Sequence, residues 1–96
     1  MKTFKDLSWK RHPAGGVLGI TQLNNHIISV VGGSFNYSSP RVDLESHEEY
    51  SSFEVAIMDS ARNIVTQEFL PNSTDDVLGW QSKGDINSLM LIVQSL

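Results

Sequence analysis

Hydrophobic and polar positions follow a two-residue period through much of the chain, which predicts β-strands. The runs Val17–Leu23 and His26–Val31 are rich in β-branched residues. Between them lies Asn24-Asn25, a pair that tolerates positive φ and suits a two-residue turn, so these runs predict an antiparallel hairpin. From Phe53 to Met58 every second residue is a large apolar one, which predicts a strand with one buried face.

A second hairpin is expected after this strand. Asp59–Asn63 has the composition of a turn, and Ile64–Phe69 is expected to be the strand that follows it. Pro71–Thr74 should then break the chain. The next apolar run, Val77–Trp80, is short enough to be either an edge strand or a buried turn.

The period changes to that of a helix at the C-terminal end of the sequence. Ser82 and Asp85 have the spacing of a capping box, which marks the start of a helix. Five apolar residues follow at spacings that place them on one helix face: Ile86, Leu89, Met90, Val93 and Leu96. We therefore expect an α+β fold, with an antiparallel sheet of four to five strands (two hairpins) and one C-terminal helix packed on one face.

Composition limits the classes of protein that fit. Ninety-six residues make one domain, and 40% hydrophobic residues are enough for a core, in which both Trp9 and Trp80 are expected. A net charge of −4 argues against nucleic-acid binding by phosphate neutralisation. The chain has no cysteine and shows no apolar run typical of a signal peptide or a membrane span, so we expect a cytoplasmic protein.

Residues 34–50 form a long polar and acidic connection, which compact domains rarely contain without a functional reason. Its carboxylates suit a basic surface on a partner protein, because complementary charge raises the association rate and the selectivity. With neighbouring residues it gives the predicted partner-binding set: Tyr37, Asp43, Glu45, Glu48, Glu49, Tyr50 and Glu54.

Two other groups of charged residues indicate different kinds of site. His47 with the carboxylates around it has the donor types of a divalent-metal site, but not the order of a known motif. The N-terminal cations Lys2, Lys5, Lys10 and Arg11, near several aromatic residues, could contact a single-stranded nucleic acid, against the negative charge of the whole chain. The chain lacks the common hydrolase, zinc-helix and phosphate-loop motifs, so no catalytic residue and no cofactor is predicted.

Several segments carry a resemblance to a known group of proteins. These are the opening Met1–Leu7, Trp9 with His12-Pro13, Ser29–Gly33, Phe53–Ile57 and Asp75–Trp80. In this pattern the chain resembles short accessory proteins of tailed bacteriophages and prophages, and Ser34–Ser51 is where it departs most from them. The resemblance transfers no site residue. It implies a setting in which small acidic proteins inhibit a host enzyme or a defence complex, anti-CRISPR proteins among them.

These observations lead to one expected function and two alternatives. We expect a non-catalytic phage protein that binds and inhibits a bacterial host or antiviral-defence protein through its acidic surface. One alternative is a structural phage protein that assembles with copies of itself, as a homodimer or a larger scaffold, through a strand edge or the helix face. The other is a small metal-dependent enzyme centred on His47.

Overall fold

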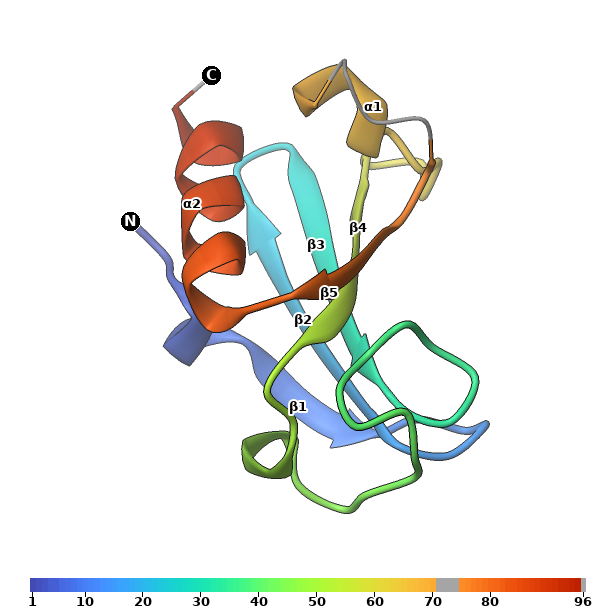
Figure 1. The fold of residues 1–96 in the computed structure, drawn as a ribbon. Helices are drawn as coiled ribbons and strands as arrows, with labels where there is room; N and C mark the ends of the chain where they lie inside the picture. The colour runs from blue at the N-terminus through green and yellow to red at the C-terminus, as the bar shows by residue number, and fades with distance from the viewer. Residues whose placement is uncertain (71–74, 96) are drawn as a thin grey trace.

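The computed structural model describes residues 1–70 and 75–95. Within this part of the chain, five strands form one antiparallel sheet in which each strand pairs with the next in sequence (Figure 1). The strands are β1 (Ser8–Arg11), β2 (Val17–Leu23), β3 (His26–Gly32), β4 (Phe53–Met58) and β5 (Leu78–Gln81). The predicted break at Pro71–Thr74 and the predicted helix-face residue Leu96 lie outside the described residues.

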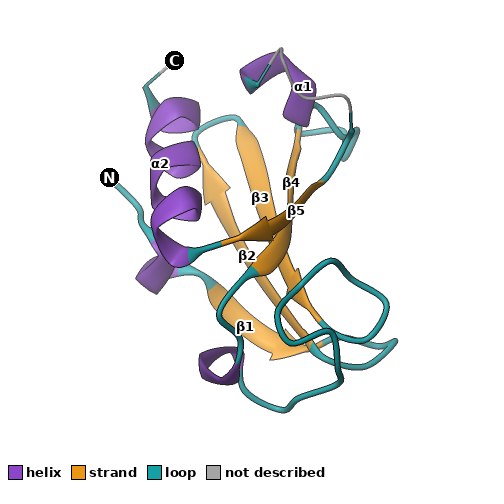
Figure 2. Ribbon diagram, in the orientation of Figure 1, coloured by secondary structure: helices purple, strands orange, loops and turns teal. Residues whose placement is uncertain are grey.

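Two α-helices and two 3₁₀ turns accompany the sheet in the same described part (Figure 2). Helix α2 (Lys83–Gln94) packs against one face of the sheet, with the 3₁₀ turn η1 (Phe4–Asp6) beside it. Helix α1 (Thr66–Phe69) is a single turn, and η2 (His47–Glu49) lies in the long connection between β3 and β4. The predicted α+β class, with an antiparallel sheet and a C-terminal helix on one face, is confirmed.

The hairpin of β2 and β3 forms in the predicted register, with Leu23 opposite His26. Asn24 has a φ of 56°, the left-handed conformation that the asparagine pair was expected to supply. At the other end of β2, Gly16 has a φ of 84°, and a Cβ there would lie 2.0 Å from the carbonyl oxygen of Gly32. Only glycine allows the two strands to approach so closely at this point.

The core lies between α2 and the facing side of the sheet. Alternate residues of β4 point inward, and the apolar face of α2 covers them as its spacing predicted. Among the residues that the structure describes, fourteen apolar ones are buried in this cluster: Phe4, Leu7, Val17, Leu23, Ile28, Val30, Tyr50, Phe53, Val55, Ile57, Ile86, Leu89, Met90 and Val93. Burying them is the main favourable contribution to folding.

Two predictions about the strands were wrong. Ile64–Phe69 is not a strand, because the chain leaves the sheet after one isolated bridge between Met58 and Ile64. The buried hydroxyl of Thr66 then accepts a hydrogen bond from the backbone of Ile57 at 2.9 Å, in place of a strand carbonyl. Strand β1 was not predicted, because of its four residues only Trp9 is turned toward the core and the others are polar and exposed.

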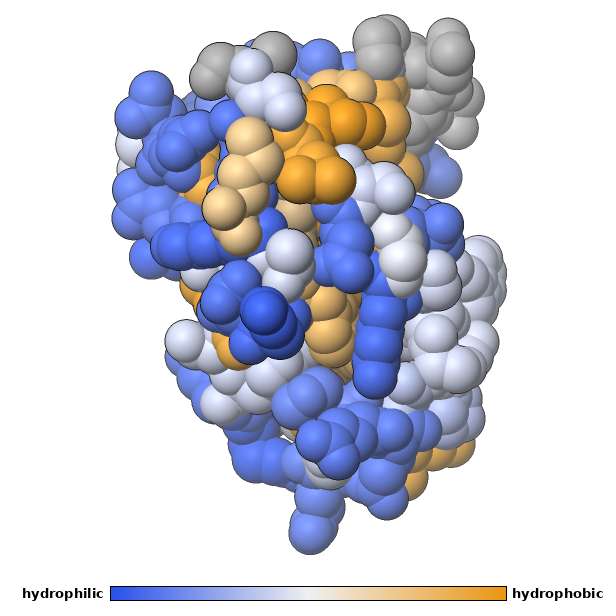
Figure 3. Space-filling model, turned by 90° about the vertical axis from the view of Figure 1, so that its left-hand side faces the viewer, coloured by the Kyte–Doolittle hydropathy of each residue, from blue (hydrophilic) through white to orange (hydrophobic). Residues whose placement is uncertain are grey.

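The outer surface is mostly polar on the side where α2 lies (Figure 3). An apolar patch interrupts it in the upper part of this view, and α2 carries two exposed large hydrophobic residues, Leu91 and Ile92. In the described part of the chain, no helix is both long and apolar enough to cross a bilayer.

The capping box at the start of α2 gives a first prediction. The hydroxyl of Ser82 accepts a hydrogen bond from the backbone of Asp85 at 3.1 Å. Replacing Ser82 with alanine should therefore lower the free energy of unfolding by about 1 kcal/mol, measured by urea denaturation. Ser88→Ala, at an exposed position of the same helix, is the matched control and should cause no loss. Equal losses in both variants would contradict the capping role.

The same cap predicts a pH dependence. The pKa of Asp85 lies below its usual 3.8 because its carboxylate accepts a hydrogen bond from the backbone of Ser82, and the Ser82 side chain lowers it further. A lowered pKa in the folded state adds stability above pH 3.8, and this stability is lost as the pH falls through the folded-state pKa. Asp85→Asn should therefore destabilise the protein at pH 7, and the difference should shrink below pH 3.8. An NMR titration that places this pKa at or above 3.8 would contradict the geometry.

Candidate functional site

The predicted partner-binding residues lie in the connection between β3 and β4 and at the start of β4, and one of them, Tyr50, is buried. The connection is held by its own contacts, among them an antiparallel bridge between Ser39 and Ser52. A capping box between Ser46 and Glu49 fixes η2, with the Glu49 carboxylate accepting from the Ser46 backbone at 3.1 Å. Some of the acidic residues in this segment therefore stabilise the loop itself.

Asp43 also serves the fold. Its carboxylate forms an ion pair with Arg11 at 3.0 Å and accepts a hydrogen bond from the backbone of Gly16 at 2.5 Å. Both groups belong to the β1–β2 hairpin, so Asp43 fastens the long connection to that hairpin. Glu45 and Glu48 are both exposed; Glu48 lies within η2 and Glu45 just before it.

Tyr50 was expected on the binding surface, but it is buried in the core at 3% exposure. Its ring packs 5.8 Å from that of Phe53, and its hydroxyl donates to the carbonyl of Val42 at 2.7 Å. The same hydroxyl accepts from the backbone of Leu44 at 2.9 Å. Because these bonds pair loop groups from inside the protein, Tyr50 shapes the loop and offers no surface to a partner.

The expected metal ligands are not brought together. Asp43 is paired with Arg11, Glu49 caps η2, and the His47 ring lies flat against Trp9 with 4.3 Å between centroids. Among residues 1–70 and 75–95, no group of three or more histidine and carboxylate side chains has the arrangement of a metal site. The geometry therefore gives no support to the metal-dependent alternative.

A pair of exposed aromatic side chains is the most distinctive feature of the surface. Trp80 is 57% exposed and Tyr37 is 43% exposed, and their ring centroids lie 4.9 Å apart. The guanidinium carbon of Arg41 lies 4.8 Å from the centroid of the Tyr37 ring. We call Tyr37 and Trp80 the aromatic pair. The expectation that Trp80 belongs to the core was wrong.

The position of Trp80 follows from a β-bulge between the last two strands. Phe53 pairs with Gln81 and Val55 pairs with Leu78, so Glu54 alone on β4 faces both Gly79 and Trp80 on β5. A bulge of this kind bends the strand and turns a side chain away from its regular direction. Trp80 has a φ of 52°, which costs a bulky residue roughly 1–2 kcal/mol. The sequence places its largest side chain at a strained and exposed position.

Backbone contacts hold the aromatic pair in place. The backbone N–H of Trp80 donates to the carbonyl of Tyr37 at 2.8 Å. The backbone N–H of Tyr37 donates to the carboxylate of Glu54 at 2.9 Å. At Gly79 a Cβ would lie 2.7 Å from the Cβ of Tyr37, so glycine is needed for this close approach. The two rings are thus presented by a fixed backbone.

A hollow of about 470 Å³ lies beside the aromatic pair. Asp75 and Asp76 line it, and Val77 and Gly79 complete the lining together with the pair. We call this space the acidic hollow. Of the predicted residues, Tyr37 lines it and Glu54 positions Tyr37, so these two belong to the site that the geometry defines.

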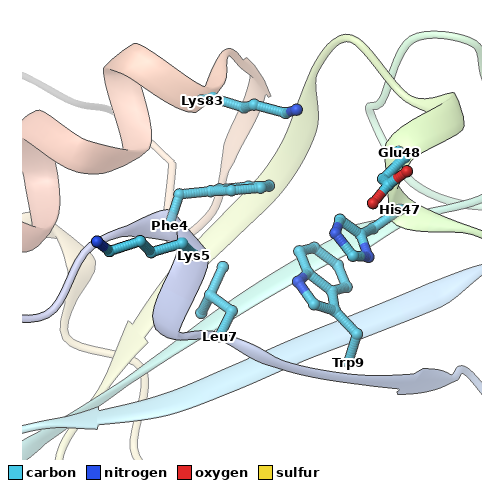
Figure 4. Close-up of a pocket in the computed structure, with 7 residues that line it drawn as sticks. All are labelled: Phe4, Lys5, Leu7, Trp9, His47, Glu48 and Lys83. Carbon is cyan, nitrogen blue, oxygen red and sulfur yellow. The ribbon is translucent and has the colours of Figure 1, made fainter.

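A second cleft, of about 550 Å³, opens between η1, η2 and the start of α2 (Figure 4). The rings of Trp9 and His47 stack face to face on one side, and the ammonium of Lys83 lies 5.5 Å from the Phe4 ring centroid on the other. The Phe4 ring is only 5.6 Å from Trp9, so these aromatic rings pack on one another as part of the core edge. Two lysines, Lys5 and Lys83, and one glutamate, Glu48, line the cleft, so its formal charge is slightly positive.

Sequence reasoning missed the residues that complete the site: Arg41, Asp75, Asp76 and Trp80. The available signal was the order of Asp75, Asp76, Gly79 and Trp80 within six residues. A glycine inside a short strand often marks a β-bulge. Two acidic residues close to the tryptophan indicate that this segment is exposed to solvent. Apolar character alone suggested burial of Trp80.

Comparison of the chain with protein-family models, curated proteins and solved structures finds no match. The candidate site is therefore defined by its own geometry. It consists of the aromatic pair, the acidic hollow and the bulge that exposes them.

The role of Tyr50 can be tested by removing its hydroxyl. Tyr50→Phe leaves two part-buried loop groups without their partner, and should lower the free energy of unfolding by about 1–2 kcal/mol in urea denaturation. Tyr37→Phe removes the same atom from an exposed ring and should change stability by less than about 0.5 kcal/mol. Equal effects of the two substitutions would refute the structural role assigned to Tyr50.

Proposed function

We propose that this chain is a non-catalytic binding module that recognises a protein partner through the aromatic pair and the acidic residues around it. The observation that carries the proposal is Trp80, an exposed tryptophan held at a positive φ by a bulge. This arrangement lowers the stability of the free protein, and a binding role gives a reason for it.

The chemistry of the aromatic pair suits a protein interface. Tryptophan, tyrosine and arginine are the residues that most often dominate binding energy at such interfaces. Here Trp80, Tyr37 and Arg41 lie together at the surface. Their fixed backbone reduces the entropy lost on binding, which favours affinity.

The charge of the protein indicates the kind of partner. The chain carries a net charge of −4, and Asp75 and Asp76 place part of it at the acidic hollow. A partner with a basic surface would be steered toward this face. The resemblance to phage accessory proteins supplies the setting, which is the bacterial cytoplasm. The proposed partner is a bacterial host protein or an antiviral-defence protein, for example of a CRISPR system. Binding of this chain inhibits that partner.

One observation favours assembly with a second copy as the competing function. The face of the sheet opposite α2 carries half-buried apolar residues on its three central strands: Leu18, Ile20, Ile27, Val31, Ala56 and Met58. Such a face gains stability when it is covered. Light scattering decides between the two functions, because a molar mass of 10.7 kDa that does not change with concentration would exclude self-assembly.

The binding proposal is tested by truncating two exposed apolar side chains. Trp80→Ala and Leu91→Ala each remove an exposed apolar side chain, but Leu91 lies on α2. Tagged parent and variants are used to capture proteins from nuclease-treated bacterial lysate, with quantitative mass spectrometry as the readout. A partner retained by the parent and by Leu91→Ala should be reduced at least tenfold with Trp80→Ala, since hot-spot truncations cost about 2 kcal/mol or more.

Two results would contradict the proposal. One is capture that is equal for all three proteins, and the other is the absence of any protein enriched by the parent. Glu45→Lys with Glu48→Lys provides a separate arm, because it reverses two exposed charges in and next to η2 without touching the contacts of Asp43. If this double variant alone loses the partner, binding belongs to the acidic loop and not to the aromatic pair.

The proposed inhibition of the partner is tested by a separate experiment. Expression of the parent in bacteria with an active defence system should raise the plaquing efficiency of a phage that the system restricts. Trp80→Ala should not raise it, and Leu91→Ala should act like the parent. An unchanged plaquing efficiency with the parent would remove the anti-defence role for that system and leave the binding proposal to the capture experiment.

A further inference from the structure

We propose that the acidic hollow receives a lysine or arginine side chain of the partner. This inference rests on the proposed function and adds the chemistry of the group that is recognised. It is carried by the joint presence of aromatic faces and carboxylates around one hollow.

The aromatic walls suit a cation. The face of an aromatic ring carries negative charge density, and it attracts an ammonium or guanidinium group within about 6 Å of the centroid. The Tyr37 ring already makes this contact inside the molecule, with the guanidinium of Arg41 4.8 Å from its centroid. Trp80, which gives the stronger cation–π contact of the two ring types, is the more exposed.

The carboxylates favour a ligand with a positive charge. Among the described residues that line the hollow, two are acidic, Asp75 and Asp76, and none is basic; Arg41 contacts the Tyr37 ring but is not one of the lining residues. Glu54 adds a third carboxylate close by, where it holds the backbone of Tyr37. Phosphate groups would be repelled here, so stacking of nucleic-acid bases on the aromatic pair is disfavoured although the rings are exposed.

The size of the hollow is also suitable. Its volume of about 470 Å³ falls in the range of roughly 300–1,000 Å³ that is common for ligand sites. That is room for one long side chain and the peptide backbone that carries it. The bond from the Trp80 backbone to the Tyr37 carbonyl holds the two aromatic walls at a fixed separation, so little order has to be gained on binding.

The test uses two peptides that differ only in charge. Capped hexa-arginine is titrated into the ¹⁵N-labelled protein, and capped hexa-citrulline, which has nearly the same shape without the charge, is the control. The chain has two tryptophans, so the two indole N–H signals are assigned with Trp80→Phe. The Trp80 signal should shift with hexa-arginine in a saturable way, the Trp9 signal should stay in place, and citrulline should shift neither.

Two variants with the same change in net charge separate the hollow from general attraction. Asp76→Asn should weaken binding of hexa-arginine by about threefold or more, whereas Glu45→Gln, at an exposed position beside η2, should weaken it by less than about 1.5-fold. Equal weakening by the two variants would overturn the inference. Equal shifts with the two peptides, no shift of the Trp80 signal, or a shift caused by a single-stranded oligothymidine would overturn it as well.

The inference and the function on which it rests fail in different ways. If capture of the partner depends on Trp80 but the arginine peptide does not bind at Trp80, the aromatic pair recognises a protein through another group. If the peptide binds as expected but capture does not depend on Trp80, the hollow binds cations and the partner-binding proposal is wrong.

Discussion

The packing of Phe53 is the interaction on which the rest of the structure depends. Its ring is fully buried and lies 5.5 Å from those of Phe4 and Trp9 and 5.8 Å from that of Tyr50. It thereby joins the N-terminal turn, the edge strand β1 and the long connection to β4. Because side chains alternate along a strand, fixing Phe53 inward also fixes Glu54 outward. The core and the candidate site are therefore set by two consecutive residues.

Beside Glu54, the edge of the sheet forms the candidate binding surface. Glu54 holds the backbone of Tyr37, and on the neighbouring strand it faces the bulge that contains Gly79 and Trp80. The bulge ends the regular pairing and exposes the indole, at the cost of a strained backbone at Trp80. The favourable burial of the core therefore compensates for the strained backbone at Trp80. In this way the core serves as the scaffold of the candidate binding surface.

The sequence predicts the parts of this protein that depend on local periodicity. The β2–β3 hairpin, the inward set of β4 and the cap and apolar face of α2 follow from spacing and turn residues, and the structure confirms them. The failures share one cause, which is that tertiary contacts override local preference. Ile64–Phe69 has strand composition, but the hydroxyl of Thr66 replaces a strand partner. Trp80 is apolar, but a bulge exposes it. Tyr50 lies in a polar loop, but its hydroxyl orders that loop from within.

The central claim is that Trp80 is kept for binding and not for stability. The most direct measurement is the free energy of unfolding of Trp80→Gly, determined by urea denaturation. Glycine adopts a positive φ without strain and removes only an exposed ring. The account predicts a value within about 1 kcal/mol of the parent, because relief of the strained φ offsets the lost contact with Tyr37. A loss of about 3 kcal/mol or more, as expected for a core tryptophan, would contradict it.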